Sequence, residues 1–159
     1  MKLLNNKKGM SLMEVLVVVL LIAGLAAMAY PSYLSSIEKT KSTEAVNIVG
    51  HTVAAVRKYI DETGASSASF KDLDFQLTGK DLSVSGATAT STNFTYTIGS
   101  DAVTATRITG SSNYSYTIQG SLSDENGEML QCVPAAGNSY DVKICSSIAK
   151  KVGEQYLIQ

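Results

Sequence analysis

One acidic residue lies alone inside the longest apolar stretch of the chain. Glu14 is the only charged residue between Met10 and Tyr30, and its neighbours there are apolar or small. A carboxylate costs about 2.5–3.5 kcal/mol at the centre of a hydrocarbon layer and less near its edge, so a plain hydrophobic anchor has no use for one. One interpretation places Glu14 near lipid headgroups, where it complements the N-terminus of a helix by about 0.3–1 kcal/mol.

A second interpretation gives Glu14 a partner made by proteolysis. Cleavage between Gly9 and Met10 would leave a free α-amino group on Met10, four residues before Glu14. An ammonium and a carboxylate at this spacing neutralise each other within one chain, or between two chains that are offset along a helical bundle. Because burial of either charge alone is costly, such a pair would fix the register of neighbouring subunits.

The flanks of the apolar stretch indicate a membrane segment. Residues 1–9 contain three lysines and no acid, which predicts that the N-terminus stays in the cytoplasm while the rest is exported. A helix over 10–30 would be about 31 Å long, close to the thickness of the hydrocarbon core of a bilayer. Two alternatives to cleavage after Gly9 stay open: an uncleaved signal anchor, and a secretory signal peptide cleaved after Ala29 at an Ala-x-Ala sequence.

The sequence 7–17 resembles the processing site of type IV prepilins. It has basic residues, a glycine at the cut and a glutamate shortly after it, followed by a long apolar run. The similarity continues through 25–33, which resembles the membrane-exit segment of that family with its proline, and covers roughly the first third of the chain. Met10 stands where phenylalanine is commoner. The resemblance implies that a prepilin peptidase cleaves after Gly9 and methylates the Met10 amine, and that Glu14 pairs with this amine of a neighbouring subunit.

The resemblance also implies a structural role. The chain would be the major pilin of a type IV pilus and would polymerise through its apolar helix, for surface motility, adhesion or DNA uptake. Its implied partners are other pilin subunits, the prepilin peptidase, the pilus assembly platform and the outer-membrane machinery. It would be a single-pass inner-membrane protein before assembly and part of an extracellular filament afterwards. A minor pilin, a type II secretion pseudopilin and a soluble domain secreted after cleavage at Ala29 are the alternatives.

Helical periodicity continues beyond the apolar stretch. Apolar residues recur at three- and four-residue steps over 34–60, while charged residues such as Glu38 occupy the other faces. Pro31 predicts a kink, because it lacks an amide hydrogen and its ring crowds the preceding turn. Gly64 ends the run as a C-cap residue would. We therefore expect one long helix over 11–63.

These patterns divide the chain into four segments. They are a basic leader (1–9), a transmembrane or filament-core helix (10–30), an amphipathic helix (31–64) and a globular domain (65–159). The expected fold class is α+β, with the long helix packed on an antiparallel β-sheet. The resemblance implies the pilin fold with its C-terminal disulfide loop.

Alternating residues in the last segment predict antiparallel strands. Aromatic or β-branched residues alternate with small or hydroxyl-bearing residues over 94–98, 103–106 and 114–118, which indicates strands with one buried face. Glycine-containing turns separate these strands. The polar stretch 65–92 predicts a surface connection between helix and sheet, held to the core by its apolar residues over 70–75.

Both cysteines, Cys132 and Cys145, lie in the part that is predicted to be exported. An even number of cysteines in an oxidising compartment favours a disulfide. The bond would close a loop of about 14 residues, which the chain-entropy model values at about 3 kcal/mol. The loop resembles the disulfide-bounded C-terminal loop of type IV pilins, and two free thiols are the alternative.

Composition and motifs argue against several other classes. With 45% hydrophobic and 17% charged residues, the chain is not disordered, and a net charge of -1 without a basic block disfavours nucleic-acid binding. His51 has no second ligand at helical spacing, so we expect a surface or packing histidine and no metal or other cofactor. The sequence has no phosphate-binding loop, nucleophile elbow or defensible carboxylate pair, so we expect neither catalytic residues nor an enzyme.

Two shorter patterns remain. The acidic segment 124–128 contains Asn-Gly and predicts a tight turn, with a calcium loop as the alternative. Triplets that begin at Asn93 and Asn113 match the acceptor pattern for N-linked glycans, a pattern that arises often by chance.

Overall fold

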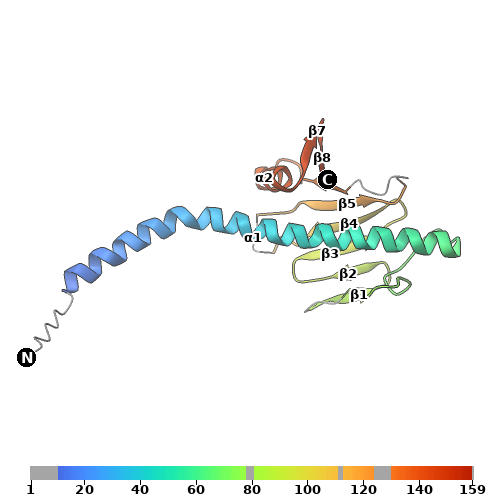
Figure 1. Cartoon of the computed structure of the whole chain (residues 1–159), viewed down its shortest axis with the longest axis horizontal. Helices are drawn as coiled ribbons and strands as arrows, with labels where there is room; N and C mark the ends of the chain where they lie inside the picture. Colours follow the sequence, from blue (N-terminus) through green and yellow to red (C-terminus); the bar gives the residue numbers. More distant parts are fainter. Residues whose placement is uncertain (1–10, 78–80, 111–112, 124–129, 159) are drawn as a thin grey trace, which may run out of the picture. The chain divides into compact units, whose positions relative to one another are not determined.

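The computed structural model describes residues 11–77, 81–110, 113–123 and 130–158 (Figure 1). The proposed cleavage site Gly9–Met10 and the acidic segment 124–128 lie outside the described residues. The chain consists of two compact units, one up to Ile37 and one from Glu38 onward. In chain order the elements are α1 (Leu12–Thr63), β1 (Ser83–Ser85), β2 (Thr88–Thr90), β3 (Phe94–Ile98), β4 (Ala102–Arg107), β5 (Thr117–Ser121), β6 (Leu130–Val133), α2 (Ser139–Ile148), β7 (Lys150–Val152) and β8 (Gln155–Ile158).

Helix α1 is one element of 52 residues with Pro31 inside it. Its end is set by Gly64, whose φ of 68° is a left-handed conformation that glycine adopts without strain. The Gly64 amide donates to the carbonyl of Ile60 at 2.8 Å. The predicted long helix and its glycine C-cap are therefore confirmed, whereas the kink at Pro31 stays a prediction.

The described strands form one antiparallel sheet in the order β1-β2-β3-β4-β5-β6-β8-β7. Strands β3 and β4 fall where the alternating residues predicted them, and they pair with Tyr96 opposite Ala105. Within the second unit, α1 lies across one face of this sheet (Figure 1). The chain therefore has the α+β, pilin-like fold that we expected, with a long N-terminal helix, an antiparallel sheet and a disulfide between Cys132 and Cys145.

The core of the second unit lies between α1 and the sheet. Its helical side is the buried stripe Ala45, Val49, Val53 and Val56, and its largest strand residues are Phe94, Tyr96 and Tyr156. Gly120 of β5 lets the helix approach the sheet closely. A Cβ atom at Gly120 would lie 2.6 Å from Val53 Cγ2 and 3.1 Å from Val49 Cγ1. This position therefore requires glycine because of the neighbouring side chains, not because of its backbone angles.

The opposite face of the sheet carries threonines. On β3 half-buried threonines alternate with buried residues, as the period of two requires. Cross-strand pairs such as Thr90 with Thr95 and Thr95 with Thr106 place the hydroxyl-bearing side chains side by side. The predicted division of these strands into one buried and one open face is therefore confirmed.

Two parts of the sheet differ from the prediction. The third predicted strand begins at Thr117 instead of residue 114, because the amide of Ser115 donates to Asp141 Oδ1 at 2.9 Å and not to a neighbouring strand. The stretch 65–92, predicted as a connection only, contains the hairpin β1–β2, which turns at Gly86 with a φ of 59°. The expected apolar pins are present, since Phe70 and Leu73 are buried.

Candidate functional site

The first unit exposes an apolar surface along α1. Every residue from Ser11 to Leu34 is exposed in this chain. We call Leu12–Leu34 the apolar segment, and its large aliphatic and methionine side chains up to Met28 are Leu12, Met13, Val15, Leu16, Val17, Val18, Val19, Leu20, Leu21, Ile22, Leu25 and Met28. By length and composition this part of α1 is able to cross a membrane.

Glu14 lies in the first turn of α1. Its amide donates to the carbonyl of Ser11 at 3.0 Å, so the residue is already part of the helix. Its side chain has no ion pair or hydrogen bond to any described residue of the chain. The expected partner, the amine of Met10 in a neighbouring copy, lies outside the described residues, and the pairing therefore stays a prediction.

Two tyrosines mark the far end of the apolar segment. Tyr30 and Tyr33 are 62% and 64% exposed and lie on either side of Pro31. Tyrosine combines an apolar ring with a polar hydroxyl and is enriched at the boundary between membrane and water. Their position is consistent with a membrane boundary near Pro31.

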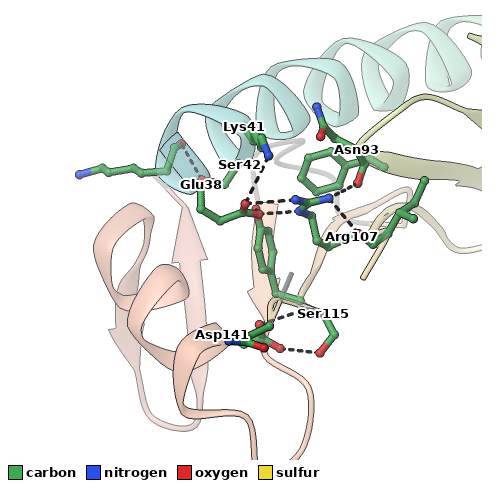
Figure 2. Close-up of polar contacts among 12 residues, drawn as sticks. Glu38, Lys41, Ser42, Asn93, Arg107, Ser115 and Asp141 are labelled. Carbon is green, nitrogen blue, oxygen red and sulfur yellow. Dashed lines mark hydrogen bonds and ion pairs between the residues drawn. The ribbon is translucent and has the colours of Figure 1, made fainter. Parts of the chain in front are cut away.

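A buried polar cluster lies at the start of the second unit. Glu38 on α1, Arg107 at the end of β4 and Tyr116 just before β5 are 3%, 6% and 0% exposed, and we call these three residues the Glu38 cluster. Arg107 Nε donates to Glu38 Oε1 at 2.6 Å, and Arg107 Nη2 donates to Glu38 Oε2 at 3.2 Å (Figure 2). The Tyr116 hydroxyl donates to Glu38 Oε1 at 3.1 Å. These three donors, together with the Lys41 Nζ at 3.9 Å from Glu38 Oε2, neutralise and solvate a carboxylate that is shielded from water.

The rest of the Arg107 guanidinium is bonded as well. Its Nη1 donates to the carbonyls of Asn93 and Ile108, both at 2.9 Å, and its Cζ lies 5.5 Å from the centre of the Phe94 ring. Burial raises the pKa of Tyr116, and the negative charge of Glu38 raises it further. Tyr116 consequently keeps its proton at neutral pH and remains a hydrogen-bond donor to Glu38.

The predicted disulfide is present between β6 and α2. Cys132 and Cys145 are buried, and their Cα atoms are 5.4 Å apart. The loop between them is held by the buried carboxylate of Asp141. This carboxylate accepts hydrogen bonds from the Ser115 amide at 2.9 Å, the Ser115 hydroxyl at 3.0 Å and the Ala135 amide at 3.2 Å. Both covalent and polar contacts therefore fix the C-terminal loop to the sheet.

The Glu38 cluster was not expected from the sequence. The prediction that Glu38 occupies a polar face of the helix is wrong, because Glu38 is the first buried residue of α1. The signal was a spacing: the buried positions 38, 42, 45, 49, 52 and 56 recur at alternating four- and three-residue steps. The partner Arg107 gave no comparable signal, since it lies 69 residues away.

His51 is exposed and borders a shallow groove that Ile48 and Phe75 also line. This agrees with a surface histidine. Among the described residues, no three His, Cys, Asp or Glu side chains gather in a way that would hold a metal ion.

Comparison with protein-family models, with curated proteins and with solved structures finds no match to this chain. The function must therefore be argued from the apolar segment, Glu14 and the Glu38 cluster themselves.

Proposed function

We propose that this chain is a structural subunit of a type IV pilus, the major pilin, with no catalytic role. The apolar segment would hold it in the inner membrane before assembly and would form the core of the filament afterwards. The observation that supports this most strongly is the uncovered apolar surface of α1, which carries one carboxylate, Glu14.

The size of the apolar surface explains why it needs a cover. Burial of twelve large apolar side chains at about 1.5 kcal/mol each would stabilise the segment by on the order of 18 kcal/mol. The cost of taking Glu14 into hydrocarbon is at most about 2.5–3.5 kcal/mol, so it does not outweigh this gain. The segment is therefore stable only in apolar surroundings, which lipid supplies to a single copy and other copies supply in a bundle.

Glu14 would decide between these two surroundings. Lipid and a helical bundle are about equally apolar, so the apolar area alone gives little preference for the filament. A carboxylate in lipid lacks a partner, whereas in the filament it would meet the Met10 amine of a neighbouring subunit. Because only one offset between copies brings these two charges together, the pair would both favour assembly and set its register.

The disulfide supports export of the second unit. Disulfides persist in oxidising compartments and are rare in the cytosol. Cys132 and Cys145 lie in the second unit, on the far side of the membrane segment from the lysine-containing residues 1–9. A cytoplasmic N-terminus and an exported second unit are the orientation that a pilus subunit needs.

The proposal is tested by Glu14→Gln in a cell that assembles type IV pili but lacks its own major pilin. Glu44→Gln is the matched control, because Glu44 is an exposed glutamate of the same helix, within the second unit. We expect filaments from the unchanged chain and from the control, seen by electron microscopy with an antibody to this chain. Glu14→Gln should be exported and cleaved normally but should yield few or no filaments.

Two results would count against the proposal. Abundant filaments from Glu14→Gln would exclude charge pairing as the assembly step. Absence of the unchanged chain from every filament, with accumulation as a soluble protein that begins at Tyr30, would favour a secreted domain instead.

A further inference from the structure

We propose that the Glu38 cluster fixes the point at which α1 becomes attached to the sheet, so that Glu38, Arg107 and Tyr116 are positioning residues for assembly. The inference rests on the proposed function in one respect only. The part of α1 before Glu38 is the part that would exchange lipid for neighbouring subunits.

The Glu38 cluster lies where the buried part of α1 begins. Glu38 is the first buried residue of the helix, and the division between the two compact units falls between Ile37 and Glu38. The next buried positions are Ser42 and Ala45, so two polar residues precede the apolar part of the stripe. The polar contacts therefore lie at the N-terminal end of the part of α1 that packs on the sheet. Without these contacts, this end would be the first part of the helix to separate from the sheet.

The hydrogen bonds of the cluster define one geometry between α1 and the sheet. The planar guanidinium of Arg107 meets both oxygens of Glu38, while its remaining nitrogen is committed to two backbone carbonyls (Figure 2). The Tyr116 hydroxyl supplies a third donor to the same carboxylate. A shift of α1 by one residue would break these bonds together and leave charges buried without partners.

The cluster consists of ions and a hydroxyl where apolar side chains could also be buried. Buried ion pairs are often no more stabilising than apolar side chains of similar volume, but removal of one partner is strongly destabilising. Apolar contacts also tolerate small slides and rotations, whereas a two-bond ion pair does not. The main effect of the cluster is therefore to fix the register of α1 on the sheet and the residue at which the attached part of the helix begins. Its contribution to stability is secondary.

This boundary has a consequence for assembly. When the preceding part of α1 changes its surroundings, the turns that begin at Glu38 would stay on the sheet. The length of helix available to neighbouring subunits would then be constant in every copy. A filament built from identical offsets needs such constancy.

The test measures distances within the second unit of the full chain in detergent micelles, by electron paramagnetic resonance between two spin labels. One pair joins Lys39→Cys to Thr106→Cys, and the other joins Ala54→Cys to Thr106→Cys; all three positions are exposed. The native cysteines are held in the disulfide and do not react. In the presence of Glu38→Gln, we expect the 39–106 distance distribution to widen at least about twofold through local opening, while the 54–106 distribution stays narrow.

Arg107→Lys is the second variant, because it keeps the charge but loses the planar fork and should fold even if Glu38→Gln does not. It should widen the 39–106 distribution to a smaller extent. Glu44→Gln is the matched control and should leave both distributions unchanged. Narrow 39–106 distributions in both variants, or equal widening at both label pairs, would overturn the inference. Since no filament is involved, this outcome is independent of whether Glu14→Gln blocks assembly.

Discussion

The close packing of α1 on the sheet at Gly120 gives a prediction in which two glycine-to-alanine changes should have opposite effects on stability. Gly120→Ala would place a Cβ 2.6 Å from Val53 Cγ2, 2.9 Å from Leu130 Cδ2 and 3.1 Å from Val49 Cγ1. Val49 and Val53 are β-branched residues in a helix, where a single χ1 rotamer dominates, so neither turns away cheaply. The helix itself must therefore move away from β5.

The expected loss follows from this overpacking. Added methyl groups in a well-packed core typically destabilise by about 1–3 kcal/mol. For a unit of this size, each kcal/mol lost from the free energy of unfolding lowers the Tm by about 4 °C. Gly120→Ala should therefore lower the Tm of the second unit by about 4–12 °C.

Gly50→Ala is the matched control, because it also adds one methyl group near Leu130. Its Cβ would lie 3.6 Å from Leu130 Cδ1, an ordinary contact, and alanine favours a helix interior over glycine by about 0.8–1 kcal/mol. We therefore expect Gly50→Ala to raise the Tm. The assay is thermal unfolding of the full chain in micelles, followed by tyrosine circular dichroism in the near ultraviolet. Equal stability of the two variants, or a more stable Gly120→Ala, would refute this account of the core.

Two further predictions concern the disulfide and a buried tyrosine. Cys132→Ala together with Cys145→Ala should lower the free energy of unfolding by about 3 kcal/mol, because the disulfide limits the entropy of the unfolded chain. Unfolding in denaturant measures this loss, and an unchanged denaturation midpoint would contradict it. Burial, and secondarily the charge of Glu44, raises the pKa of Tyr96 to about 12 from an ordinary value of 10.0. The unfolded chain therefore releases this proton first as the pH rises, so stability should fall by up to about 1.4 kcal/mol per pH unit between pH 10 and 12. Tyr96→Phe should remove this contribution to the fall of stability with pH. If the unchanged chain and Tyr96→Phe lose stability equally between pH 10 and 12, the pKa of Tyr96 is not raised by folding.

The sequence predicted those parts of the fold that follow from local periodicity. The long helix and its end at Gly64 follow from three- and four-residue spacing and from one glycine. Strands β3 and β4 follow from strict alternation of large and hydroxyl-bearing residues. The disulfide followed from cysteine parity together with the predicted compartment.

The parts that escaped prediction depend on contacts between distant residues. Burial of Glu38 contradicts the usual preference of carboxylates for water. Its partner Lys41 lies three residues away on the same helix, but its hydrogen-bond donors Arg107 and Tyr116 lie 69 and 78 residues away. The late start of β5 depends in the same way on Asp141. Its carboxylate accepts a hydrogen bond from the Ser115 amide, which therefore does not pair with a neighbouring strand. None of the distant partners Arg107, Tyr116 and Asp141 is visible in a local pattern of residue types.

The sequence supports a proposed role for Glu14, but a single copy of the chain does not contain the pair of charges that this role requires. Its expected partner belongs to another copy, and no described residue of its own chain forms an ion pair or hydrogen bond with its carboxylate. The apolar segment shares this property, because no described residue of the chain covers it.

Retention of the apolar segment in the mature protein is the central claim, and intact-mass spectrometry of the protein sheared from the cell surface tests it most directly. We predict a chain of residues 10–159 with one added methyl group on the Met10 amine. A chain that begins at Tyr30, and therefore lacks the twenty residues from Met10 to Ala29, would contradict it.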